Sequence, residues 1–143
     1  MKMRMILTLL ALTAFVLGLS VTSAAQAAPR ALLKVDIPFD FIVGGMHLPA
    51  GQYTLLHLSG PNNIMLRNAQ GHGEAVVQVS VTNSELGEGE AKLVFTRYGD
   101  KVFLSQVWTE SDNQIHQCVK CREELTLEAQ KAKPESMTIE THP

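Results

Sequence analysis

The sequence predicts a mainly β domain, and two patterns support this prediction. From Leu33 onward, short runs rich in Val, Leu, Phe and Tyr alternate with turn residues at a spacing of roughly eight to twelve positions. Helical periodicity is absent until Cys121. We therefore expect a small antiparallel β-sandwich or partly closed β-barrel of about six to seven strands, with one C-terminal helix.

Residues 1–27 have the order of a secretory signal peptide. Lys2 and Arg4 give a cationic start, an apolar stretch runs from Ile6 to Leu19, and small residues follow. That stretch holds about 14 residues, whereas a helix needs about 20 to span a bilayer. Ala25-Gln26-Ala27 fits the small-x-small cleavage pattern. We expect cleavage after Ala27, or alternatively after Ala25, and a periplasmic or secreted protein without a transmembrane anchor.

The first predicted strand alternates between apolar and polar residues from Leu33 to Val43. Pro38 interrupts it, because proline has no N–H to donate, so we expect an edge strand or a bulge there. Gly44-Gly45 permits the positive φ angles of a tight hairpin turn. Pro49-Ala50-Gly51 then turns the chain into a second strand, Gln52 to Leu58.

Two more strands are predicted at Ile64 to Arg67 and Glu74 to Thr82, with polar turns around them. The clearest supersecondary signal follows. Leu93 to Tyr98 and Val102 to Trp108 are joined by Gly99-Asp100, a two-residue link with glycine at its first central position. These residues predict a β-hairpin.

The C-terminal part is predicted to be helical and then unstructured. Glu110 to Gln114 is a polar turn, and Cys121 to Lys133 contains good helix formers with a weak apolar stripe. Pro134 ends this helix, and residues 134–143 have too little apolar periodicity to pack, so we expect a flexible tail. No internal repeat is present, and we expect one domain over residues 28–133.

Charge and motifs exclude several function classes. The chain has 12 Lys and Arg against 14 Asp and Glu, a formal net charge of -2, which leaves no basic footprint for nucleic acid. There is no G-x-S-x-G elbow, phosphate-binding loop or dinucleotide fingerprint. No residue is therefore predicted to be catalytic, and a non-enzymatic role is favoured.

The sharpest local feature is the C-x-x-C motif formed by Cys118 and Cys121, and three interpretations stay open. In an exported protein the pair forms a local disulfide or rests as thiols. Lys120 and Arg122, together with a helix N-terminus, could instead lower a thiol pKa for redox chemistry, although β-hairpins rather than a βαβ unit precede the motif. Zinc binding by His116 with both cysteines lacks a fourth ligand. Arg122 stands where c-type haem attachment requires histidine.

Trp108 and Tyr53 are candidates for lining a ligand cleft, because aromatic side chains line many small-molecule sites. The alternative is that the aromatic residues of the predicted strands belong to the core. We expect an exported, non-enzymatic binding or structural module that contacts a protein, an envelope component or a small ligand. The alternative is a thiol-based redox or metal-binding protein that uses Cys118 and Cys121.

Three segments extend this interpretation: Val35-x-Ile37-Pro38-Phe39-Asp40-Phe41-x-Val43-Gly44, Leu48-Pro49-Ala50-Gly51-x-Tyr53 and Leu93-Val94-Phe95-x-Arg97-Tyr98-Gly99-Asp100-x-x-Phe103-Leu104-x-x-Val107-Trp108. In these segments the chain resembles a family of small exported proteins of unknown function that is numerous in acidobacterial genomes. The resemblance implies a small β domain outside the cytoplasm and carries no activity, cofactor or catalytic residue. Cys118 and Cys121 depart from the family's usual segment before the last helix.

Overall fold

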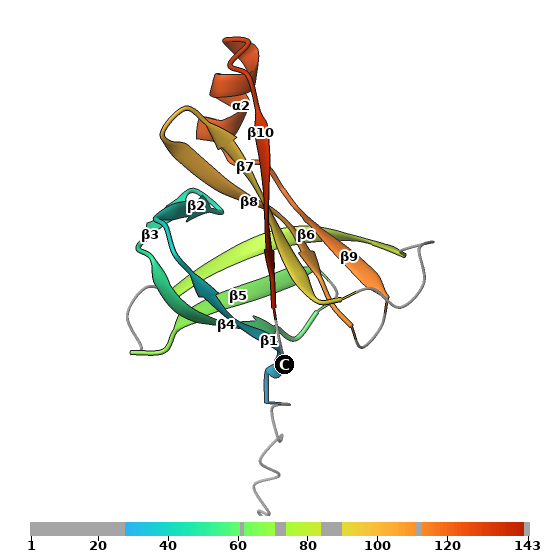
Figure 1. The fold of residues 1–143 in the computed structure, drawn as a ribbon. Helices are drawn as coiled ribbons and strands as arrows, with labels where there is room; N and C mark the ends of the chain where they lie inside the picture. Colours follow the sequence, from blue (N-terminus) through green and yellow to red (C-terminus); the bar gives the residue numbers. More distant parts are fainter. Residues whose placement is uncertain (1–27, 61, 71–73, 84–89, 111–112, 142–143) are drawn as a thin grey trace, which may run out of the picture.

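The computed structural model describes residues 28–60, 62–70, 74–83, 90–110 and 113–141. This part of the chain is mainly β with one short helix, as the sequence predicts (Figure 1). Its elements are β1 (Arg30–Ile37), β2 (Phe41–Val43), β3 (Met46–Leu48), β4 (Gly51–His57), β5 (Asn63–Asn68), β6 (Glu74–Asn83), β7 (Lys92–Tyr98), β8 (Lys101–Trp108), β9 (Gln114–Cys118), α2 (Arg122–Ala129) and β10 (Glu135–Glu140). The predicted signal sequence and its cleavage site at Ala27 lie outside the described residues.

The strands form one open sheet in which β6 belongs to two parts. The first half of β6 pairs with β5 in the order β1-β4-β5-β6, and its second half pairs with β9. From β9 the sheet continues through β8 and β7 to β10, while the β2–β3 hairpin joins β8 by a short parallel contact. Strands β1, β3 and β10 each have one neighbour within the described residues, so they form the open edges.

The predicted hairpin over residues 93–108 is confirmed as β7 and β8. The two strands are antiparallel, with Tyr98 opposite Lys101, and Gly99 in the turn has φ +65. Within the described ranges ten strands form the sheet, more than the six to seven expected, because several of them are too short or too polar to be predicted from sequence.

The first predicted strand, Leu33 to Val43, is in fact two strands. β1 ends at Ile37, immediately before Pro38, and β2 begins at Phe41. Proline cannot donate to a strand ladder, and between the strands the Asp40 carboxylate accepts the Ala50 N–H at 2.9 Å. β2 then turns back into β3, which the sequence did not predict because it has only three residues.

Two predictions for the C-terminal part are wrong. Residues 135–140 are not a flexible tail but strand β10, because Met137 and Ile139 pack on the core beside β7. The helix is also shorter than the predicted 121–133, spanning Arg122–Ala129, and Lys131 beyond it has φ +57. β9 was missed because its sequence is mostly polar.

Buried side chains form two clusters on opposite faces of β8. Val102 and Leu104 point into the main core, where Phe41 makes edge-to-face contacts with Tyr53 and Phe95 at centroid distances of 5.3 and 5.7 Å. Phe103 lies between Val102 and Leu104 in sequence, so its side chain points to the other face, which we call the outer face. There the small core consists of Ile42, Tyr98 and Phe103, packed against Cys121, Leu127 and Ala132.

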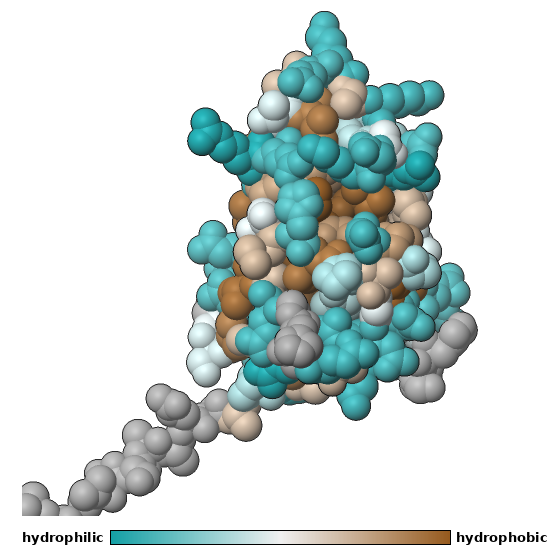
Figure 2. All heavy atoms as spheres, turned by 90° about the vertical axis from the view of Figure 1, so that its left-hand side faces the viewer, coloured by the Kyte–Doolittle hydropathy of each residue, from teal (hydrophilic) through white to brown (hydrophobic). Residues whose placement is uncertain are grey.

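Helix α2 therefore covers the outer face at one end of the β7–β8 hairpin, and Figure 1 shows it beside the hairpin tip. Figure 2 views the side that carries the β2–β3 hairpin, where hydrophobic residues gather at mid-height between hydrophilic ends. Among the described residues, no helix combines the length and the hydropathy needed to cross a membrane.

Candidate functional site

Of the two structural alternatives for the cysteine pair, a local disulfide or free thiols, the structure has free thiols at both Cys118 and Cys121. Cys118 is 4% exposed and belongs to the main core, opposite Val79 on β6. Burial, and then the charge of Glu124, raise the pKa of the Cys118 thiol to about 12. A thiol that initiates redox chemistry in the folded protein needs the opposite shift, because the thiolate is the nucleophile.

The three candidate zinc ligands do not come together. His116 and Cys118 are both buried on the core side of β9, and the His116 ring lies 6.4 Å from the ring of His57. Cys121 instead packs against the small core on the outer face. Over the part of the chain that the structure describes, no cluster of three or more His, Cys, Asp or Glu side chains has a geometry that could hold a metal.

Tyr53 and Trp108 do not share a cleft. Tyr53 is 1% exposed, its hydroxyl donates to the Pro49 carbonyl at 2.7 Å, and its ring packs on Phe41. Trp108 follows the core residue Val107 on β8 and therefore points to the outer face. Of the two predicted cleft residues, Trp108 alone is placed where a ligand could reach the ring without opening the main core.

Trp108 belongs to a set of polar side chains on the outer face that we call the amide platform. Its residues come from β7, β8 and β9 and are all half-buried: Thr96, Ser105, Gln106, Trp108 and Gln117. Strand register brings them together, since Gln106 lies opposite Gln117 and β8 pairs with β7 on its other side. The platform lies next to the small core that α2 covers.

A bulge concentrates polar groups on the platform. The β7–β8 register shifts between Val94 and Phe95, which lie opposite Gln106 and Leu104 respectively. Ser105 is therefore the extra residue, and a bulge of this kind allows two successive side chains to share one face. Ser105 and Gln106 consequently both contribute to the platform.

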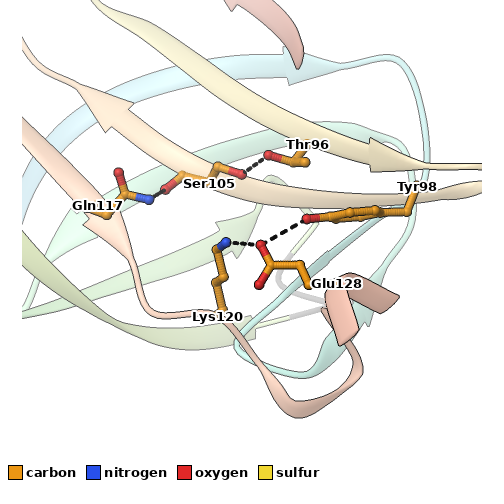
Figure 3. A network of polar contacts seen from close by, with 6 residues as sticks. All are labelled: Thr96, Tyr98, Ser105, Gln117, Lys120 and Glu128. Carbon is orange, nitrogen blue, oxygen red and sulfur yellow. Dashed lines mark hydrogen bonds and ion pairs between the residues drawn. The ribbon is translucent and has the colours of Figure 1, made fainter. Parts of the chain in front are cut away.

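Hydrogen bonds link the platform into a continuous network. The Trp108 indole donates to Gln106 Oε1 at 3.0 Å, and Gln106 Nε2 donates to Gln117 Oε1 at 2.8 Å. Gln117 Nε2 donates to the Ser105 carbonyl at 3.2 Å, and the Ser105 hydroxyl lies 2.5 Å from the Thr96 hydroxyl (Figure 3). An amide carries two N–H donors and two acceptor lone pairs, so each glutamine can still donate one bond and accept another.

The platform residues themselves carry no charge, and a cation lies against the ring of Trp108. The Lys92 ammonium lies 4.2 Å from the centroid of the Trp108 ring. Lys92 in turn lies opposite Glu140 in the β7–β10 register, so an acidic residue stands across from it on the neighbouring strand. The charges around the platform therefore do not favour a strongly anionic ligand.

Helix α2 borders the platform through a second polar group. The Tyr98 hydroxyl donates to Glu128 Oε1 at 3.2 Å, and Lys120 forms an ion pair with the same carboxylate (Figure 3). Burial, and then the charge of Glu128, raise the pKa of Tyr98, whereas the hydrogen bond from Lys120 lowers the pKa of Glu128. These contacts position α2 at the end of the network.

A further depression of about 490 Å³ lies between the β2–β3 hairpin and the β7–β8 turn, with Asp40, His47 and Lys101 in its lining. Glu123 of α2 bridges its rim: it pairs with Lys101, and its Oε2 lies 3.3 Å from His47 Nε2. All three of these side chains reach solvent, so the pairs contribute little to stability.

Sequence reasoning found Trp108 but missed Gln106 and Gln117. Isolated glutamines form no motif, and β9, which carries Gln117, was not predicted as a strand. The alternation of the predicted hairpin could have placed Gln106 near Trp108. Comparison with protein-family models, curated proteins and solved structures finds no match to this chain.

Proposed function

We propose that the protein is an exported, non-enzymatic binding module that holds a neutral glycan of the cell envelope on the amide platform. The observation that carries this proposal is Trp108 beside two mutually bonded glutamines on an outer sheet face. The signal-like residues 1–27 and the resemblance to exported proteins support the location.

The chemistry of a sugar complements this surface. A sugar ring presents weakly positive C–H groups on its faces, and an aromatic ring has a negatively polarised face that attracts them. Sugar hydroxyls both donate and accept hydrogen bonds, as do the free donor and acceptor positions of Gln106 and Gln117. The absence of a carboxylate among the platform residues favours an uncharged ligand over a cationic one.

The network also prepares the surface for binding. Each amide is already held by its neighbours, so less side-chain entropy is lost when a ligand binds. Against this, a sugar that stacks on the half-buried indole of Trp108 must displace the Lys92 ammonium, at a cost of about 0.5–1 kcal/mol. An open platform of this size suits weak binding, with a Kd of about 0.1–1 mM for a short oligosaccharide.

The thiol-based alternative has less support. One thiol is buried in the main core with a raised pKa, and the other lies on the far side of the sheet. A binding function uses the polar surface without requiring either cysteine.

The test is a calorimetric titration of the protein with uncharged oligosaccharides of the cellulose, starch and chitin types. Gln106→Ala and Gln117→Ala each remove part of the network and should weaken binding about tenfold, equal to about 1.4 kcal/mol. Gln52→Ala is the matched control, because Gln52 is an exposed amide on β4, and it should bind as the wild type does.

Two results would contradict the proposal. One is the absence of saturable binding to any of the three glycan types up to about 20 mM, far above the expected Kd. The other is binding that both platform variants retain at full strength while they remain folded.

A further inference from the structure

We propose that Cys118 and Cys121 are a redox-sensitive pair, and that their oxidation to a disulfide releases helix α2 from the sheet. This inference concerns α2 and the thiols alone, so it does not depend on the glycan proposal. The two cysteine side chains are three residues apart in sequence but belong to different cores.

The thiols lie on opposite sides of the sheet. Cys118 is the last residue of β9 and is buried in the main core opposite Val79. Cys121 is the residue before α2 and packs against the small core on the outer face. Between them, the Val119 N–H donates to the Gln78 carbonyl at 2.9 Å, which fixes the chain where it leaves the strand.

A disulfide cannot join the two thiols while both stay in place. The bond requires Cβ atoms about 3.5–4.5 Å apart with side chains that point toward each other. One cysteine must therefore leave its core. β9 is paired on both sides, with β6 and with β8, whereas Cys121 lies outside any strand and is half-buried. Cys121 is the side chain that moves.

Movement of Cys121 removes one of the anchors of α2. The helix has eight residues, and a helix this short is marginal in water without tertiary contacts. The other apolar contacts with the small core come from Leu127 in the helix and Ala132 just after it, because Leu125 is 51% exposed. The ion pairs of Glu123 and Glu128 are exposed and contribute little.

The chemistry needs a disulfide oxidant, such as oxidised glutathione. The Cys121 thiolate attacks that disulfide, forms a mixed disulfide and expels one glutathione thiolate. The Cys118 thiolate then attacks the Cys121 sulfur and expels the second glutathione. Two protein thiols lose two protons and two electrons, and one glutathione disulfide becomes two glutathiones. Because burial raises the pKa of Cys118 to about 12, the second step should wait for a local opening of the structure.

The experiment treats the folded protein with oxidised glutathione and follows intact mass together with hydrogen exchange. We expect the glutathione adduct on Cys121 first and the internal disulfide second. Amides of Arg122–Ala129 should then exchange about tenfold faster or more, while β7 and β8 keep their protection, and a reductant should reverse the change.

Two variants separate the internal disulfide from other causes. Cys118→Val keeps the core filled, and its reaction should end at the glutathione adduct on Cys121, with the amides of α2 still protected from exchange. Cys121→Ser should leave Cys118 unreacted in the folded protein. The proposal is overturned if the disulfide forms while α2 stays protected, or if only denatured protein oxidises. It is also overturned if the adduct alone releases α2 in Cys118→Val.

Discussion

Two adjacent glycines in the turn between β2 and β3 allow a matched test of how this hairpin is held on the sheet. Gly44 and Gly45 both have positive φ, +56 and +81, and both are exposed. They differ in what a Cβ would meet. At Gly44 it would lie 2.8 Å from the Val76 carbonyl oxygen of β6, whereas at Gly45 nothing lies within 4 Å. Gly44→Ala should therefore destabilise the protein more than Gly45→Ala.

The magnitude follows from two contributions. Alanine in a left-handed conformation costs about 1–2 kcal/mol, and the stiffer unfolded chain returns about 0.4–1 kcal/mol of this. Gly45→Ala should thus lower the free energy of unfolding by about 1 kcal/mol. Gly44→Ala adds a clash with strand backbone, and relieving such overpacking typically costs about 1–3 kcal/mol. Its total should be about 2–4 kcal/mol.

Urea unfolding of the two variants and the wild type measures these values directly. The midpoints should fall in the order wild type, Gly45→Ala, Gly44→Ala, with similar slopes. If the two variants differ by less than about 0.5 kcal/mol, the close approach of the hairpin to β6 is not what makes glycine necessary at position 44.

Three other perturbations test separate parts of the structure. Leu127→Ala should lower the free energy of unfolding by about 1–2 kcal/mol and speed hydrogen exchange in α2. Leu125→Ala, at an exposed position, should change the free energy of unfolding by less than about 0.5 kcal/mol. Equal effects of the two substitutions would contradict the packing of α2 on the small core. Glu124 is 4% exposed, and burial raises its pKa, an effect that Lys120 opposes. Its contribution to stability is therefore present below the ordinary pKa of 4.5 and lost as pH rises through the raised value. Glu124→Gln should be more stable than the wild type at pH 7 and lose that advantage in acid, and urea midpoints with the same pH dependence in both proteins would refute this assignment. Removal of residues 135–143 should lower the thermal midpoint and promote aggregation through the exposed β7 edge, whereas an unchanged midpoint would mean that β10 adds nothing to the fold.

The parts of the fold that sequence could predict are those that local rules determine. The β7–β8 hairpin has strong alternation and a two-residue glycine turn, and it is present as predicted. The same rules did not predict β10, because its two apolar residues, Met137 and Ile139, are too few to indicate a strand by themselves. They become sufficient only beside β7, which supplies a ready edge and an apolar surface.

In the candidate site, too, some residues could be predicted from local sequence and others depend on strand pairing. Trp108 could be singled out because tryptophan is rare and it falls on a predicted strand. Gln106 and Gln117 gain meaning only from the pairing of β8 with β9, which no local pattern specifies. The C-x-x-C spacing left both a disulfide and free thiols open, since spacing alone cannot show that the two thiols face different cores.

The most direct test of the proposed function uses Trp108, the only tryptophan of the chain. Its indole N–H, bonded to Gln106 Oε1, gives one side-chain resonance that can be followed by NMR as a neutral oligosaccharide is added. We predict a saturable shift of this resonance together with the side-chain amides of Gln106 and Gln117, while the Gln52 amide stays unchanged. Shifts confined to other residues, or no shift for any glycan that the protein retains, would contradict binding at the platform.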